Sequence, residues 1–547
     1  MALYTKINSI SQVLALNLFL VASIVITPFY SFESINLPKF VVLVFFGCIA
    51  LTQILLNAKV MISTLSIISR VIVIGMLATY FFVFILSDTP WQQQVFGREN
   101  RRNGLITYLC LILIFIVFNG ISYSKYLKVF VNRIAIAGII VTSYSVIQLM
   151  GFDPFKWDSV NLHFFSTLGN PNFLSAYLAI IAIPTLSFIF NNLKNLNSKI
   201  KLTILLIISV LFSYLIFRTI SYQGFISLFA SASIFILVVL YKSKRKILFI
   251  LTSTFVASGA IVALIGTLKI GPLANVLYKS SVTSRGDFFR AAVNSGNSNF
   301  FNGTGFDSFG DYFLLYRDDV AGNRPNGEFT DSAHNYFLDL YATQGFFGLV
   351  FYLLLTVVTL YSFTKIIRTK DFEISSAVLF ASWVAVQVQS LVSPTNFLFS
   401  ILIYSISGIV IGSASNMESN SRIRLNNFSV AIGCFLALLI TIPPISRENL
   451  ILKANQQSSP EKFISSLDKF PKSTVGYSRA INLFAQAGLE NQALYVSREA
   501  INFNVRTPAA HLIIFTSLQS SKEEKLQAYK SLLELDPMNP KLYGLEP

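Results

Sequence analysis

The sequence predicts an all-α, polytopic membrane helix bundle of about 12–13 spans, with a large extracytoplasmic loop and a C-terminal helical-repeat domain. Three observations predict this fold class. Charged residues make up only 12% of the 547 residues, about half of the usual fraction in soluble proteins. The mean hydropathy is +0.62, too apolar for a soluble core to bury. Apolar segments of spanning length recur until about residue 445 and then stop.

Thirteen apolar segments are long enough to cross a bilayer. The first is too long for a cleavable signal peptide, lacks a cleavage-type ending and is followed by further spans, so it is expected to stay as a helix. The predicted spans are 9–29, 38–57, 68–86, 104–121, 131–150, 173–191, 200–217, 222–241, 247–268, 345–364, 375–393, 396–413 and 427–444.

Basic residues predict how these spans are oriented. With a cytoplasmic N-terminus and alternating spans, four basic loops all fall on the cytoplasmic side, as the positive-inside rule requires. Residues 269–344 and the C-terminal tail then lie outside. The four loops contain Lys194, Lys199 and Lys201; Lys242, Lys244, Arg245 and Lys246; Lys365, Arg368 and Lys370; and Arg422 and Arg424.

The net charge of +16 does not indicate nucleic-acid binding, because most of the cations flank spans, where membrane lipids and orientation explain them. Cys48, Cys110 and Cys434 lie within apolar stretches and are expected to be small buried hydrophobes. Neither a disulfide framework nor a metal cluster is expected from them. The sequence also lacks a Walker loop, a Rossmann glycine pattern and paired His/Cys ligands, so no nucleotide cofactor is expected.

The sequence divides into two predicted domains, 1–445 and 446–547. Residues 458–543 are amphipathic and are punctuated by Pro471, Pro508 and Pro537. Small residues between them stand where paired helices approach closely. We interpret the tail as two degenerate tetratricopeptide-like repeats; the alternative is a generic helical hairpin domain.

Residues 269–344 form the one long polar interruption of the apolar region. Long loops held beside a rigid scaffold commonly carry function, and the aromatic content predicts a packed loop, the alternative being a disordered connection. Arg285 and Arg290 lie early in this loop, and arginine grips phosphate oxygens with a fixed fork. His334 stands between Asp331 and Asn335 at a helix entrance, where an imidazole could take a proton from a hydroxyl.

Three further polar motifs border predicted spans. Residues 97–104 carry three arginines, among them Arg102, which either anchor helix ends at headgroups or serve a site. Gly169-Asn170-Pro171-Asn172 is by itself typical of a turn and a helix cap. Residues 218–224 combine Arg218 with Gln223 and several hydroxyl groups, which suits a phosphate headgroup; the alternative is a snorkelling arginine.

Taken in order, these motifs resemble the O-antigen ligase and polymerase superfamily, bacterial membrane glycosyltransferases of the C type. The resemblance covers about residues 90–415. It rests on the order of short motifs relative to the spans: residues 97–104, 169–172 and 221–224, Arg285 with Gly303-Thr304-Gly305, and Ala333-His334-Asn335 with residues 345–348. Some members also carry a tetratricopeptide-like tail.

The resemblance implies transfer of a glycan from an undecaprenyl-diphosphate carrier to an acceptor hydroxyl, outside the bacterial plasma (inner) membrane and without a metal or other cofactor. It implies that Arg285 binds the diphosphate and that His334 activates the acceptor. Where many members have Ser-Arg-Gly, this chain has Tyr222-Gln223-Gly224 after Ser221, so Arg218 or Gln223 would take over that contact. Arg290 is a further candidate for the diphosphate, and the candidates for supporting roles are Arg102, Asn170, Asn172, Asp331 and Asn335.

The leading hypothesis is therefore a lipid-linked oligosaccharide ligase, with a surface-polysaccharide polymerase and a protein O-oligosaccharyltransferase as alternatives that differ in the acceptor, which is a glycan, lipid or protein. The tail could recruit a protein partner. From another class, a transporter would usually show ionisable residues inside its spans, and here Arg70 and Arg133 lie close to span ends. A membrane scaffold, whose tail does all the work, predicts that His334 and Arg285 are dispensable.

Overall fold

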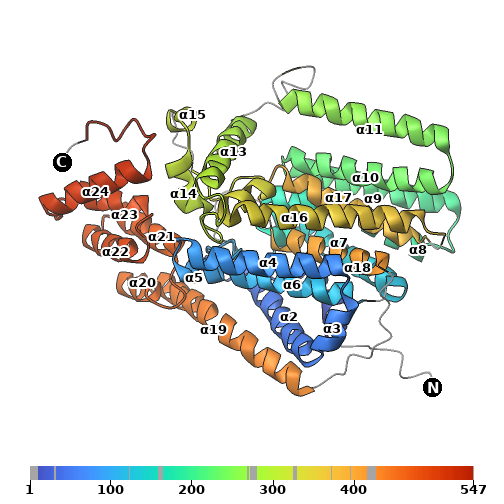
Figure 1. Ribbon diagram of the computed structural model, residues 1–547. Helices are drawn as coiled ribbons and strands as arrows, with labels where there is room; N and C mark the ends of the chain where they lie inside the picture. The colour runs from blue at the N-terminus through green and yellow to red at the C-terminus, as the bar shows by residue number, and fades with distance from the viewer. Residues whose placement is uncertain are drawn as a thin grey trace.

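The chain folds into a membrane helix bundle with a helical assembly at one end (Figure 1). The structure, a computed structural model, describes residues 10–29, 32–121, 123–157, 164–267, 270, 280–324, 329–370, 372–394, 396–415 and 427–545. Within these ranges the regular secondary structure is helical throughout, with no strand. Arg422 and Arg424, two of the residues used to predict the orientation, lie outside the described residues.

Each of the thirteen predicted spans coincides with a helix. Among the described residues, 9 helices are long and apolar enough to cross a membrane. They are α2 (Asn36–Leu56), α4 (Ile67–Leu86), α7 (Tyr123–Leu149), α8 (Pro171–Asn192), α9 (Ser198–Arg218), α10 (Tyr222–Lys242), α16 (Tyr336–Arg368), α18 (Phe397–Ala414) and α19 (Asn427–Gln456).

The other four predicted spans also coincide with apolar helices, of which 10–17 consecutive residues have described side chains. The all-α, polytopic bundle predicted from the sequence is thus confirmed. Which side of the membrane each loop occupies stays a prediction. The four helices are α1 (Ile10–Ile24), α6 (Leu105–Asn119), α11 (Lys246–Thr267) and α17 (Ile374–Ser390).

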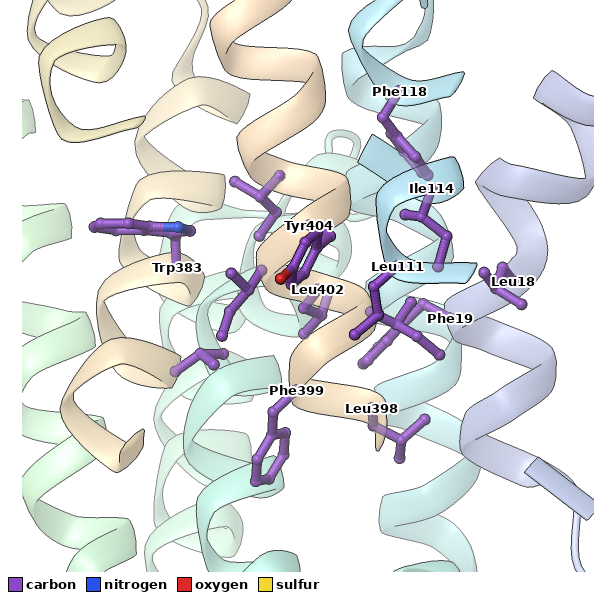
Figure 2. Packing of buried hydrophobic residues seen from close by; sticks show 14 of the residues in the cluster. Leu18, Phe19, Leu111, Ile114, Phe118, Trp383, Leu398, Phe399, Leu402 and Tyr404 are labelled. Carbon is purple, nitrogen blue, oxygen red and sulfur yellow. The ribbon is translucent and has the colours of Figure 1, made fainter. Parts of the chain in front are cut away.

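The most deeply buried span is α18, which lies between α17 on one side and α6 and α1 on the other (Figure 2). Its small residues allow this close packing. A Cβ atom at Gly412 would stand 2.2 Å from the carbonyl oxygen of Asn119 on α6, and one at Gly408 would stand 2.7 Å from that of Phe115. Small residues serve the same purpose in membrane helix interfaces generally, because they let two backbones approach.

The loop between α11 and α16 is folded over its described residues, and its aromatic residues pack as predicted. It contains α13 (Ser280–Ser298), α14 (Phe309–Tyr316) and α15 (Asp319–Gly322). A small core joins α13 and α14 to the start of α16, whose helix bends at Gly345 with φ +68°. This core contains Phe288, Ala291, Ala292, Phe309, Phe313, Ala333 and Ala342. Residues 268–269, 271–279 and 325–328 of the loop lie outside the described residues.

The tail consists of helices that pack on one another in sequence order. The predicted boundary at residues 445 and 446 falls inside α19, which continues without a break from the membrane into the tail. The division into two domains and the tetratricopeptide-like character of the tail stay predictions. The tail helices are α20 (Pro460–Leu467), α21 (Thr474–Gln486), α22 (Glu490–Phe503), α23 (Pro508–Thr516) and α24 (Lys522–Leu535).

Figure 1 shows that the tail and the loop helices α13–α15 lie at the same end of the bundle, beside the short helix α5 (Trp91–Phe96). Helix α14 contacts α24 directly. The connection between α5 and α6 therefore contacts both the loop and the tail. Polar residues of these three segments lie close together there.

Candidate active site

The connection between α5 and α6 is a compact turn that brings three arginines together. Gly97 has φ +72°, and a Cβ atom at Gly104 would stand 2.3 Å from the backbone nitrogen of Gly97. Glycine is required at both positions for this reason. The turn thus explains why the motif at residues 97–104 begins and ends with glycine.

The arginines of this turn bind carboxylates of the protein. Buried Arg102 pairs with Glu33, which accepts from its Nε at 2.9 Å and from Nη2. Arg98 Nη1 lies 2.6 Å from Asp311 Oδ1 on α14. The predicted supporting residue Arg102 is therefore placed in a buried ion pair that ties the turn to the segment before α2.

Arg101 is surrounded by three aspartates of the loop and of α16. Its guanidinium lies 3.0 Å from Asp307, 3.2 Å from Asp331 and 3.2 Å from Asp339. Burial alone would lower the pKa of Arg101, but the three carboxylates together raise it above its usual value. Arg101 is thus a fixed cation at the centre of this cluster.

His334 lies directly before α16 with φ +51°, in the left-handed region that is uncommon for residues other than glycine. Its neighbour Asn335 caps the helix: Oδ1 accepts from the backbone N–H groups of Phe337 and Leu338. The Nδ2 of Asn335 donates to the carbonyl of Leu391 at 3.1 Å. Asn335 therefore fixes the start of α16, a positioning role that fits its prediction as a supporting residue.

The imidazole of His334 stacks on the ring of Phe288, with the centroids 5.3 Å apart. Phe288 lies three residues after Arg285 on α13, so both side chains are on one face of that helix. The stack consequently brings the predicted base near the predicted diphosphate ligand.

The electrostatic surroundings keep His334 neutral. Burial lowers the pKa of His334 to about 4, and the positive charge of Arg285 contributes to the decrease, whereas the carboxylate of Asp331 opposes it. Burial also lowers the pKa of Arg285. Among the described residues, Arg285 forms no salt bridge with a carboxylate. A neutral imidazole thus lies beside a guanidinium that is available to an anion.

Arg290 differs from Arg285 in being paired. Its Nη2 lies 2.6 Å from Asp287, and its Nε contacts Asp318, which caps α15. Asp287 also binds Arg324 at 2.7 Å. The structure therefore places the predicted diphosphate ligand Arg290 in a network that holds α13 against α15.

The motifs around Asn172 and Gln223 meet, although they are 51 residues apart. Gln223 is buried, and its Nε2 donates to the carbonyl of Asn172 at 2.8 Å. A Cβ atom at Gly224 would stand 2.0 Å from Ser175 Oγ, so α8 and α10 pack closely here. Asn170 caps α8 by accepting from the backbone N–H of Asn172 at 2.8 Å.

Arg218, the alternative diphosphate ligand, is exposed at the end of α9. Its Nη1 donates to the hydroxyl of Tyr214 at 2.9 Å. The donor group of Gln223 is already used by Asn172, whereas Oε1 of Gln223 has no hydrogen-bond partner among the described residues. Of the two candidates, Arg218 is thus the one that still presents a cation.

The tail contributes buried contacts to the same assembly. Arg317 of the loop binds Asp536 through two hydrogen bonds of 2.9 and 2.8 Å, with both side chains buried. Asn504 donates to Asp311 at 3.2 Å. Arg447 of α19 pairs with Glu99 in the α5–α6 turn. The tail is therefore packed against the loop and the turn through polar contacts.

Sequence reasoning did not single out Phe288, Arg101 or its partners Asp307 and Asp339. Arg101 belonged to a recognised motif, but its partners lie more than 200 residues away, and nothing local identifies them. In the part of the chain that the structure describes, no group of three or more His, Cys, Asp or Glu side chains could hold a metal ion.

Two comparisons with known proteins bear on this site. A search of curated proteins found no match to the chain. Residues 207–353, which include Arg218, Gln223, Arg285 and His334, match the family model described as O-Antigen ligase. This match supports a relationship to the O-antigen ligase superfamily and a glycosyl transfer of the ligase or polymerase type, performed by a multi-pass membrane protein.

Proposed function

We propose that this protein transfers a glycan from an undecaprenyl-diphosphate carrier to an acceptor hydroxyl on the extracytoplasmic side of the bacterial plasma membrane. One observation carries the proposal: the neutral imidazole of His334 lies beside Arg285, which no described carboxylate neutralises. This pair contains one proton acceptor and one fixed cation, the two groups that a transfer from a diphosphate carrier needs.

In the proposed step, the imidazole of His334 takes the proton of the acceptor hydroxyl while the acceptor oxygen attacks the anomeric carbon. The bond between that carbon and the diphosphate oxygen breaks, and undecaprenyl diphosphate leaves with the electron pair. The guanidinium of Arg285 stabilises the charge that develops on the leaving group, which lowers the barrier as well as favouring binding. Asp331 stabilises the imidazolium that forms, since its charge favours protonated His334.

The donor would itself activate the base. Arg285 lowers the pKa of His334 in the free protein by its positive charge. A bound diphosphate adds negative charge at this position, so the pKa of His334 rises toward its ordinary value when the donor is present. An imidazole with a pKa closer to neutrality is a stronger proton acceptor. The proposed site thus becomes more basic when the donor occupies it.

Arg218 is proposed as the second diphosphate contact, because its side chain is exposed at the end of α9. Gln223 and Asn172 hold the start of α10 against the start of α8 and support this corner. Arg290 and Arg102 have supporting roles through their ion pairs.

The test is transfer by purified protein in detergent, with an undecaprenyl-diphosphate-linked oligosaccharide as the donor. His334→Asn removes the base but tolerates the left-handed backbone, and Arg285→Gln removes the cation. Arg498→Ala, at an exposed ion pair of α22, is the control. The proposal expects loss of transfer by about 10²-fold or more in the first two variants and normal transfer in the control. Full transfer by His334→Asn would refute it.

The choice of acceptor distinguishes the three alternatives. Offered in parallel, a lipid-linked core saccharide reports a ligase, a second carrier-linked glycan reports a polymerase, and a peptide with serine and threonine reports protein O-oligosaccharide transfer. A wild-type protein that binds the carrier lipid but transfers to none of them would favour a transporter or a scaffold.

A further inference from the structure

We infer that Arg101 is the positioning residue of His334: it fixes the backbone of residues 331–333, directly before the histidine. This inference rests on the proposed function, because it assigns Arg101 a role in presenting the proposed base. Arg101 belongs to the turn between α5 and α6, which lies outside the region matched by the family model.

The first contact is with the loop before His334. Arg101 Nη1 donates to the backbone carbonyl of Asp331 at 2.8 Å and to its carboxylate at 3.2 Å. One guanidinium nitrogen therefore holds both the main chain and the side chain of Asp331, which restricts the rotation of this residue.

The second contact passes through Asp339 on the first turns of α16. Arg101 Nη2 donates to Asp339 Oδ2 at 3.2 Å, and Asp339 Oδ1 accepts the backbone N–H of Ala333 at 2.9 Å. Asp339 thus uses one oxygen for the arginine and the other for the residue that precedes His334. Together with the first contact, residues 331–333 are held at both ends.

These contacts explain how His334 keeps a positive φ. A left-handed conformation costs roughly 1–2 kcal/mol for an ordinary residue and persists only where the surroundings fix it. The contacts from Arg101 act before His334, and the cap formed by Asn335 acts after it. With both neighbours fixed, the imidazole is directed onto Phe288, beside Arg285.

A fork of donors is needed for this role. Arg101 reaches Asp331 and Asp339 with two different nitrogens, while its Nε faces Asp307. A lysine would supply the charge but not this planar arrangement. Arg101→Lys therefore separates the geometric role from a purely electrostatic one, and Arg101→Gln removes both.

The test is the titration of His334 followed by NMR of the imidazole in the full-length protein in detergent. The chain has only His163, His334 and His511, so the signal is assigned by its absence in His334→Asn. Arg317→Gln is the matched control, because it breaks a buried arginine–aspartate pair of the same loop without touching residues 331–335. The transfer assay described above gives kcat and KM.

The charge of Arg101 contributes to the lowered pKa of His334, so Arg101→Gln should raise the titration midpoint on electrostatic grounds alone. Arg101→Lys keeps this charge, so a raised midpoint in this variant reports an imidazole that has left its buried position. We expect this rise in Arg101→Lys and no change in Arg317→Gln. We expect Arg101→Lys to lower kcat by about 10²-fold with a much smaller change in KM for the donor, since a misplaced group slows the reaction more than it weakens binding. The inference is overturned if Arg101→Lys keeps the wild-type kcat or the wild-type titration midpoint of His334. If His334 proves dispensable for transfer, only the proposed function is contradicted. The titration still tests whether Arg101 positions the imidazole.

Discussion

The imidazole of His334 and the ring of Phe288 stack at a centroid distance of 5.3 Å with an angle of 30° between their planes. This contact joins the segment before α16 to the face of α13 that carries Arg285. The proposed base and the proposed diphosphate ligand are adjacent because of it, although 49 residues separate them in the sequence.

Phe288→Leu should impair catalysis more than folding. Leucine keeps most of the buried apolar volume but loses the stack, and an aromatic pair contributes about 0.5–1.5 kcal/mol beyond burial. Up to about a tenfold decrease of kcat is expected if this energy serves to orient the imidazole. Steady-state transfer kinetics measure it, with Phe309→Leu as the control, since Phe309 is buried in the same small core and packs on Phe313 as Phe288 does. Equal effects of the two substitutions would speak against orientation by the stack.

The pH dependence of transfer should report the lowered pKa of His334. A general base acts when unprotonated, so activity is present above its pKa and is lost as the pH falls through it. Because the pKa of His334 is lowered to about 4, kcat/KM for the free protein should stay constant from neutral pH down to about pH 5.

Removal of the positive charge of Arg285 should change the pH at which kcat/KM begins to fall. Burial is the main cause of the lowered pKa of His334, and the charge of Arg285 adds to it. In Arg285→Gln this added contribution is absent, so the acid limb of kcat/KM should shift to higher pH. The bound donor should have a similar effect in the wild type, where the acid limb of kcat should lie above that of kcat/KM. Profiles of both constants between pH 4 and pH 8 test this; identical limbs in wild type and variant would exclude His334 as the titrating base.

Gly224→Ala should destabilise the contact between α8 and α10. The new Cβ atom would stand 2.0 Å from Ser175 Oγ and 2.8 Å from the Ser175 carbonyl oxygen, so the helices must separate. Overpacking of this kind typically costs about 1–3 kcal/mol. The expected result is a lower Tm in detergent. Gly259→Ala on α11 is the control, because its Cβ would meet only Phe229 at 3.9 Å, and a similar loss of Tm there would refute the explanation.

Asp536→Asn should loosen the attachment of the tail. Arg317 would remain buried without its charged partner, and breaking a buried pair in this way costs about 3–5 kcal/mol. Limited proteolysis of the native protein should then release the tail sooner than in the wild type. Glu524→Gln serves as the control: its pair with Arg498 is exposed, and such pairs contribute at most about 1 kcal/mol. An unchanged cleavage rate in Asp536→Asn would show that the pair does not hold the tail.

The spans could be predicted because apolar length is a local property of the sequence. Thus α18 was recognisable from its composition, although its central position depends on the fit of Gly408 and Gly412 against α6. Arg285 and His334 were predicted from motifs within one loop. Their shared environment was not, because it depends on how α13 docks against α16.

The role of the turn between α5 and α6 shows where sequence reasoning ends. Its arginines could equally have served lipid headgroups, since charge near a span end indicates no particular partner. Arg101 meets Asp307, Asp331 and Asp339 only after the loop has folded back over the turn. The positive φ of His334 could likewise not be predicted: histidine adopts such a φ more often than most residues, but only a few per cent of non-glycine residues do so.

Helix α19 links the last predicted span to the tail in one element. Its 30 residues make a helix about 45 Å long, whereas the hydrocarbon layer is about 30 Å thick. The C-terminal part, beyond Pro443 and Pro444, is held by two buried contacts: Arg447 pairs with Glu99, and Glu448 accepts from the backbone of Phe32. Because Glu99 belongs to the same turn as Arg101, a displacement of the tail would reach the proposed site through this pair.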